Sequence, residues 1–338
     1  MSRKSEPARA GNGHRPQRKG GGRGDRVMVP PADFRSYYGR PVIKPPVWTH
    51  DVAAYLFTGG LAAGAALVAA GADLTGRPAL RVTGRVTALA ALGASGYLLV
   101  KDLGRPERFL NMLRVAKPTS PMSMGTWIFS AFSAAAGVAA AAEVAPWLPR
   151  DGAVGLAARA LPAAGRVGGL AAAATAPALA TYTAVLFSDT ANPAWHAAYP
   201  RLPFVFAGSA LASGGAAGMI GAPVREAGPA RALAVAGAAL ELTATHGVEH
   251  RMGLLSEPYR IGKAGRLLRA ARLLTAAGAA GALLGARSRV VSTLAGAALL
   301  AGSVATRFGV FEAGKTAAED PKYTVVPQRE RLAAREGA

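Results

Sequence analysis

The sequence contains no cysteine, and this absence excludes two kinds of chemistry. Without thiolates the chain cannot ligate an iron–sulfur cluster through cysteine, and it cannot form a disulfide bond. Histidine is scarce as well, with five residues in all. A membrane b-type haem needs axial ligands, typically histidines, that face each other from different helices. Only His50 with His246 is left as such a pair, so we expect no haem, and no motif for a metal site is found.

Acidic residues are few too, 19 against 39 basic ones, which gives a formal net charge of +20. Nucleic-acid-binding proteins can be this basic, but 51% of this chain is hydrophobic, which is too apolar for that class. A disordered chain would also be far less apolar. High charge and high apolarity coexist when they occupy different segments, as in polytopic membrane proteins. We therefore predict an integral membrane protein with no nucleic-acid partner.

The apolar residues gather in eight runs, each near the ~20 residues that cross a bilayer core. Because such runs satisfy their backbone hydrogen bonds in lipid as helices, we predict an all-α fold with about eight transmembrane helices. Arg85, near the start of the second run, can extend to the membrane interface. The sixth run departs from the pattern because Glu241 lies inside it. The predicted spans are residues 52–72, 82–100, 124–142, 167–187, 203–222, 230–246, 267–286 and 290–306.

Two segments of the sequence are weakly similar to each other. Residues 57–63 align with residues 206–212 at an offset of 149 (206 − 57). With eight spans both segments enter the membrane from the same side, so the halves would be parallel four-helix bundles rather than inverted repeats. Chance similarity between helices rich in alanine and glycine is the alternative. The motifs Gly60-x-x-x-Gly64 and Gly214-x-x-x-Gly218 predict faces where helices pack closely.

Positive charge orients the predicted bundles. Lysine and arginine are more numerous on the side that holds both termini, chiefly because of the N-terminal tail. The positive-inside rule then places both termini in the cytoplasm and the chain in the inner (cytoplasmic) membrane. The predicted organisation is a disordered basic tail (1–34), an interfacial loop broken by prolines (35–50), a first four-helix bundle (51–200), a second four-helix bundle (201–308) and a cytoplasmic C-terminal tail (309–338).

Ionisable and phenolic side chains near or inside the apolar runs are the candidates for function. At the start of the first run, His50, Asp51 and Tyr55 are suited to bind a quinone carbonyl and take up its proton, or else to anchor the helix at the interface. Tyr182 lies well inside the fourth run, so its hydroxyl needs a partner or a ligand. Glu241 is either a proton-relay carboxyl or one half of a buried pair.

Two loop segments also concentrate polar residues. The second run ends in a compact loop that carries Asp102, Arg105 and Arg108. Asp102 and Arg105 pair with each other, or cap a helix end, or serve function. Ser120 and Trp127 belong to the Ser-Pro-Met-Ser-Met-Gly-Thr-Trp segment that opens the third run, where proline and glycine shape a non-helical start.

Four motifs stand out together: Tyr-Tyr-Gly-Arg-Pro-Val-Ile-Lys-Pro-Pro at 37–46, the Gly59-Gly60 pair, Asp-Leu-Gly-Arg-Pro-x-Arg-Phe-x-Asn-Met-Leu-Arg at 102–114, and Ser-Pro-Met-x-x-Gly-x-Trp at 120–127. They resemble the NrfD-like family, the integral membrane subunits of polysulfide-reductase-type complexes. The resemblance covers about residues 35–330 and is most specific in the last two motifs.

The resemblance implies an eight- or nine-helix, quinone-reactive membrane anchor without haem. It implies two partners, a ferredoxin-like iron–sulfur subunit and a molybdopterin catalytic subunit. Electrons would pass between menaquinone or ubiquinone and the nearest cluster of the iron–sulfur subunit. The chain alone would then show no turnover, because it lacks an electron acceptor of its own.

Carried onto this sequence, the family's quinone site falls on His50, Asp51, Tyr55 and Tyr182, with Tyr55 in place of a family histidine. On this hypothesis Asp102 and Glu241 pass protons, and the loop motif toward the partner comprises Arg105, Arg108, Ser120 and Trp127. Two alternatives remain. A secondary transporter would suit the repeat and the intramembrane glutamate, and in a purely structural anchor the polar residues would only pack helices.

Overall fold

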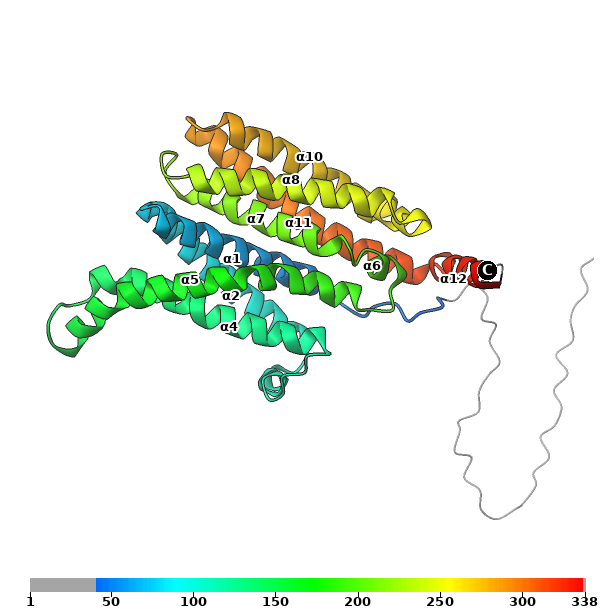
Figure 1. The fold of residues 1–338 in the computed structure, drawn as a ribbon, viewed down its shortest axis with the longest axis horizontal. Helices are drawn as coiled ribbons and strands as arrows, with labels where there is room; N and C mark the ends of the chain where they lie inside the picture. Colours follow the sequence, from blue (N-terminus) through cyan, green and yellow to red (C-terminus); the bar gives the residue numbers. More distant parts are fainter. Residues whose placement is uncertain (1–40, 337–338) are drawn as a thin grey trace, which may run out of the picture. The chain divides into compact units, whose positions relative to one another are not determined.

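The computed structural model describes residues 41–336, and within this range every regular element is a helix (Figure 1). The predicted basic tail and the first part of the 37–46 motif lie outside the described residues. The α-helices are α1 (His50–Leu74), α2 (Pro78–Asp102), α3 (Phe109–Met112), α4 (Pro121–Ala141), α5 (Gly152–Ser188), α6 (Pro193–Ala197), α7 (Leu202–Gly221), α8 (Gly228–His250), α9 (Glu257–Arg260), α10 (Gly262–Leu284), α11 (Arg289–Glu319) and α12 (Lys322–Glu336). Three short 3₁₀ helices are η1 (Pro106–Arg108), η2 (Ala142–Trp147) and η3 (Gly253–Ser256).

Seven helical segments in the described range are long and apolar enough to cross a membrane. They are α1, α2, α4 with η2, α5, α7, α10 and α11. This confirms an all-helical, membrane-spanning fold, whereas the count of eight stays a prediction. The sixth predicted run does form a helix, α8, packed along α7. Over a membrane-length stretch it is less apolar than the other seven helices, because alanine and glycine provide most of its apolar residues and Glu241 lies at its middle.

The predicted boundary between two four-helix bundles is crossed by extensive packing. α1 lies along both α2 and α7 (Figure 1), and α5 also contacts both α1 and α7. The division into two bundles therefore stays a prediction. The last long helix also differs from its predicted span, since α11 continues to Glu319 rather than ending near Thr306.

The small-residue faces predicted from sequence lie where α1 meets α7. A Cβ atom built on Gly64 would collide with the carbonyl oxygen of Ala210, and one built on Gly214 would collide with the backbone of Gly64. Only glycine lets the two backbones come this close. This contact fixes α1 against α7 near their middles, and it thereby positions the N-terminal end of α1.

Gly64→Ala should lower the stability of the folded chain by about 1–3 kcal/mol, because the added methyl forces α1 and α7 apart. Gly71→Ala is the matched control on the same helix, since a Cβ there meets only open space. Alanine at that position should change stability by no more than about 1 kcal/mol, in the favourable direction. Thermal unfolding of the purified protein in detergent measures both. Equal melting temperatures for the two variants would contradict the close contact.

The segment between α5 and α7 is fixed to α11 by a buried tryptophan. Trp195 on α6 is 1% exposed, and its Nε1 donates to the carbonyl oxygen of Val310 at 2.8 Å. The indole lies so close to α11 that a Cβ on Gly314 would overlap it. Because α6 is held in this way, His196 and Tyr199 have defined positions beside the end of α5.

Candidate functional site

The first helix begins at the residues that the sequence marked as candidates. Thr49 caps α1, and its hydroxyl accepts a hydrogen bond from the backbone N–H of Asp51 at 3.3 Å. An acidic residue in the first turn is favoured by the helix dipole. This start places His50 and Asp51 in the first turn and Tyr55 one turn further along. Tyr55 is buried, with 7% of its surface exposed.

His50 and Asp51 take part in ion pairs at the end of the helices. The Nε2 atom of His50 lies 2.8 Å from Oε1 of Glu312, which Lys263 also contacts at 2.8 Å. Asp51 lies 3.0 Å from the ammonium of Lys101. These pairs connect α1 to α2, α10 and α11, and they form a charged rim around the N-terminal end of α1.

The two candidate tyrosines come together in the structure. Tyr55 and Tyr182 line one small cavity of about 30 Å³, with Gly125 and Phe129 of α4 beside them. This volume is about that of one water molecule in the liquid. Gly125 makes room for the Tyr182 ring, because a Cβ at this position would overlap it. The packing of α1, α4 and α5 thus brings together two tyrosines that are 127 residues apart in the sequence (182 − 55).

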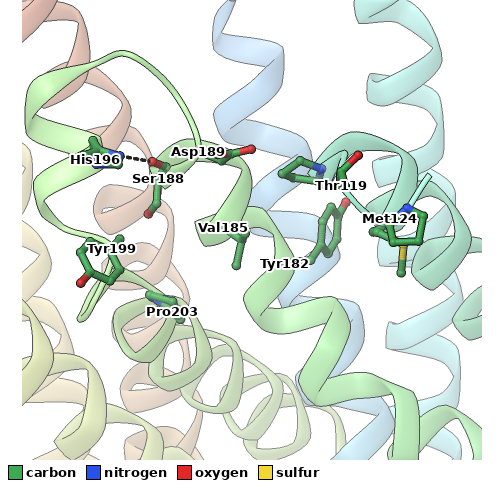
Figure 2. A pocket seen from close by; sticks show the side chains of 11 residues that line it. Thr119, Met124, Tyr182, Val185, Ser188, Asp189, His196, Tyr199 and Pro203 are labelled. Atoms are coloured by element: carbon green, nitrogen blue, oxygen red, sulfur yellow. Dashed lines mark hydrogen bonds between the residues drawn. The ribbon is translucent and has the colours of Figure 1, made fainter.

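A larger pocket of about 460 Å³ also has Tyr182 in its wall (Figure 2). Apolar and proline side chains cover most of its wall. Polar groups stand around it: Tyr182 on one side, Ser188 and His196 on the other, and Asp189 between them (Figure 2). The lining residues are Pro118, Thr119, Pro121, Met124, Tyr182, Val185, Ser188, Asp189, His196, Tyr199 and Pro203.

His196 is oriented by a backbone carbonyl. Its Nδ1 atom lies 3.0 Å from the carbonyl oxygen of Ser188. Because a carbonyl only accepts hydrogen bonds, Nδ1 carries the hydrogen, and in the neutral ring Nε2 is then the basic nitrogen. His196 and Asp189 are both exposed, so this pair of titratable groups links the pocket to solvent.

Sequence reasoning did not assign Thr119, Asp189, His196 and Tyr199 to a site. The last three lie just beyond the fourth apolar run, where they have the composition of an ordinary loop. One pattern in the sequence could have indicated an ordered segment here: Asn192-Pro193, a typical helix start that follows Asp189. The Asn192 side chain does cap α6, accepting from the N–H of Trp195 at 3.3 Å.

The loop candidates lie at the same end of the helices but line no part of the pocket. Asp102 accepts a hydrogen bond from Thr49 Oγ1 at 3.3 Å, and it makes no ion pair with Arg105 in the part of the chain that the structure describes. Arg105 and Arg108 are exposed. Ser120 caps α4 by accepting from Ser123 N at 3.4 Å. Trp127, also on α4, is 41% exposed.

Glu241 occupies a separate, fully buried position between α8 and α11. Thr306 donates a hydrogen bond to its Oε1, and its Oε2 has no partner among the described residues. The nearby cation is Arg307, which is 1% exposed. The structure therefore brings Tyr55 and Tyr182 together, and it places Glu241 elsewhere in the bundle.

The comparisons with known proteins identify the family. No curated protein matches the chain. The family model described as "Polysulphide reductase, NrfD" matches residues 42–247, a range that contains α1, α2, α4, α5, α7 and nearly all of α8. This range includes both tyrosines and every residue that lines the large pocket. Since the match covers more than half of the chain, this protein belongs to the NrfD polysulphide reductase family, the membrane subunits of oxidoreductase complexes.

Proposed function

We propose that this chain is the quinone-reactive membrane subunit of a molybdopterin oxidoreductase complex. It exchanges electrons between menaquinone or ubiquinone and the iron–sulfur subunit of that complex. The observation that carries the proposal is the pocket of about 460 Å³ beside Tyr182. Its volume falls in the range of about 300–1,000 Å³ that is typical of small-molecule sites, and it combines an apolar wall with a few polar groups.

The residues present fit a quinone headgroup. Pro121, Met124 and Val185 provide flat or flexible apolar surface for a ring. The Tyr182 hydroxyl is a hydrogen-bond donor for a carbonyl oxygen, and His196 gives a second donor when it is protonated. A bound quinone supplies an acceptor of two electrons and two protons. The exposed His196 and Asp189 hold and release protons at the solvent side of the pocket.

The four residues assigned by resemblance have different parts in this proposal. Tyr182 contacts the headgroup directly. Tyr55 supports it from behind, because the cavity that both line holds about one water molecule. His50 and Asp51, with Asp102 nearby, form the charged rim through which protons and the partner subunit approach.

The electron partner must bring its own redox centres. The whole sequence contains no cysteine, so an iron–sulfur cluster next to this site needs ligands from another subunit. The exposed Arg105 and Arg108 lie in the loop that follows α2, at the end of α1 that carries the rim. We place the iron–sulfur subunit at this end. We also retain α8 as an eighth span, with both termini on the cytoplasmic side of the inner membrane.

Tyr182→Phe should lower quinol oxidation by the intact complex about tenfold, because it removes one hydrogen bond to the headgroup and leaves the ring in place. Tyr97→Phe is the matched control, since Tyr97 lies on α2, is 69% exposed and lines none of the pockets described above. Steady-state assays in membranes should show the loss mainly in kcat/KM. A transporter or a structural anchor would show equal rates for both variants, and such a result would remove Tyr182 from the site.

A further inference from the structure

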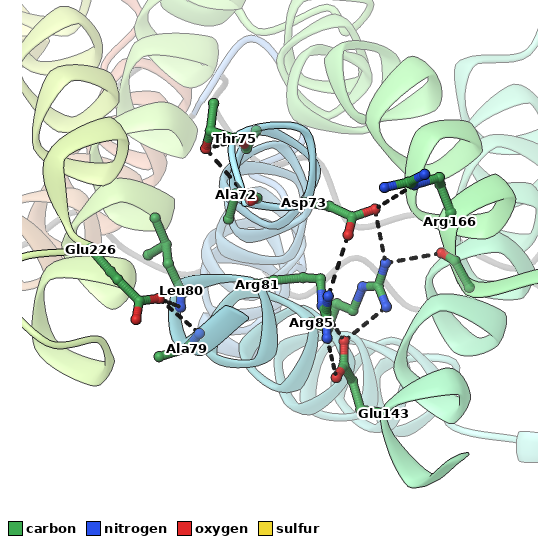
Figure 3. A network of polar contacts seen from close by, with 12 residues as sticks. Ala72, Asp73, Thr75, Ala79, Leu80, Arg81, Arg85, Glu143, Arg166 and Glu226 are labelled. Carbon is green, nitrogen blue, oxygen red and sulfur yellow. Dashed lines mark hydrogen bonds and ion pairs between the residues drawn. The ribbon is translucent and has the colours of Figure 1, made fainter. Parts of the chain in front are cut away.

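The opposite end of α1 carries a partly buried network of arginines and acids (Figure 3). Glu143 of η2 accepts hydrogen bonds from Arg81 Nε and from Arg85, each at 2.8 Å. Asp73 of α1 lies 3.4 Å from Arg81 and 3.5 Å from Arg166. Arg85 is 7% exposed, and its guanidinium turns into this network at the end of the membrane-spanning helices, the end toward which the sequence predicts it to extend. The acids that bind it come from α1, the preceding helix, and from η2, 58 residues further along the chain (143 − 85).

A cavity of about 880 Å³ adjoins the network. Five arginines line it and only two acids, Asp73 and Glu143. The arginines are Arg81, Arg85, Arg150, Arg159 and Arg166. Arg81 and Arg85 bind both acids, and Arg166 also lies 3.5 Å from Asp73, so five arginines around two acids leave a net excess of positive charge at the cavity.

Two details indicate that this positive charge is directed toward a ligand. Arg150 and Arg159 are exposed, and among residues 41–336 no carboxylate lies within ion-pair distance of either. The Nε of the buried Arg85 has no hydrogen-bond partner in the same range. A buried guanidinium N–H without an acceptor is costly, and an anion in the cavity would provide one.

The cavity also lies at a depth suited to lipid headgroups. It is formed where α1 ends, α2 begins and α5 begins, which is the end of these membrane-spanning helices. Trp147 of η2, beside the cavity-lining Pro146, is 82% exposed. Exposed tryptophan is enriched at the level of lipid headgroups. Arginine binds phosphate oxygens in a planar, two-pronged geometry that lysine lacks.

We propose that this cavity binds a phosphate-bearing anion, either the headgroup of an anionic phospholipid or free phosphate. Arg150, Arg159 and Arg166 bind the phosphate, and the Asp73–Arg81–Arg85–Glu143 network forms the fixed base of the site. The site is separate from the Tyr182 pocket, which is formed at the other ends of α4 and α5. It is therefore independent of the proposed quinone chemistry.

The test compares anion binding by the full-length protein in its complex, purified in a zwitterionic detergent. A fluorescent short-chain phosphatidylglycerol is titrated, and its anisotropy gives the apparent Kd. Arg150→Gln/Arg159→Gln should weaken binding about thirtyfold, about fivefold for each arginine removed near an anionic headgroup. The network residues stay intact in this variant, so the fold is retained.

Arg225→Gln/Arg287→Gln is the matched control. Both of these arginines are exposed in loops at the same end of the helices, and neither lines the cavity. The control should bind the probe as the unaltered protein does. Competition by inorganic phosphate would identify free phosphate as the ligand, and binding of the lipid without such competition would identify the headgroup. If Arg150→Gln/Arg159→Gln binds the lipid probe with the same affinity as the control, the proposed site is wrong.

Discussion

Replacing Arg307 by leucine should lower the free energy of unfolding by about 3–5 kcal/mol, because Glu241 then remains as an unpaired acid in the interior. The exposed fractions of the two side chains are 1% for Arg307 and 2% for Glu241. They lie within Coulombic range of each other, on α11 and α8. A charge at such depth is strongly disfavoured unless an opposite charge or hydrogen bonds compensate it.

Arg307 also holds three helices together. Its guanidinium donates to the carbonyl oxygen of Phe206 at 3.0 Å, and it lies 3.8 Å from the centre of that ring. Its Nε points to the carbonyl oxygen of Leu56 on α1 at 3.5 Å. A leucine keeps part of the side-chain volume but none of these polar contacts. The loss therefore includes cation–π and hydrogen-bond contributions together with the charge effect.

A double-mutant cycle separates the charge effect from the rest. Glu241→Leu/Arg307→Leu should recover much of the stability that Arg307→Leu loses, because it removes both buried charges. Arg266→Leu is the control, since Arg266 lies exposed on α10. Unfolding in mixed micelles of increasing SDS content gives the free energies. If the losses in the free energy of unfolding of the two single variants simply add in the double variant, the two residues are not coupled. That result would contradict a buried pair of Glu241 and Arg307.

Much of the fold could be predicted from the sequence because apolar runs of membrane length have few alternatives to a helix. Seven of the eight predicted runs coincide with apolar, membrane-length helices. The glycine motifs of α1 and α7 also predicted a close contact correctly, since small residues at helical spacing leave room for a backbone. Tyr182 was identifiable because a phenol inside an apolar run needs a partner.

The rest depended on contacts between distant segments. Arg307 follows directly after the last predicted span, at the edge of the predicted second bundle, and only the continuation of α11 to Glu319 makes it a core residue. The sequence predicts that Arg85 extends to the membrane interface, but it does not predict that Asp73 and Glu143 bind its guanidinium. His196 faces the pocket only because Trp195 fixes α6 to α11. No periodicity in the sequence encodes these three arrangements.

Gly125→Ala should lower quinol oxidation by about a hundredfold while the complex still assembles. The Cβ of alanine at position 125 would overlap the Tyr182 ring, one edge of which packs against α4 at this glycine. The ring must therefore move, and it forms part of the wall of both the small and the large cavity. A displacement of about 1 Å at a binding group is enough to cost about a hundredfold in rate.

Two comparisons show whether this loss arises at the pocket. Gly137→Ala on the same helix places its methyl in open space, so it should keep full activity. In Gly125→Ala/Tyr182→Ala the overlap is removed together with the phenol ring, so activity should stay low. Recovery of activity in this double variant would mean that the Tyr182 hydroxyl has no part in quinone binding. Because removing the overlap cannot restore a missing donor, the activity of the double variant separates the steric role of Gly125 from the chemical role of Tyr182.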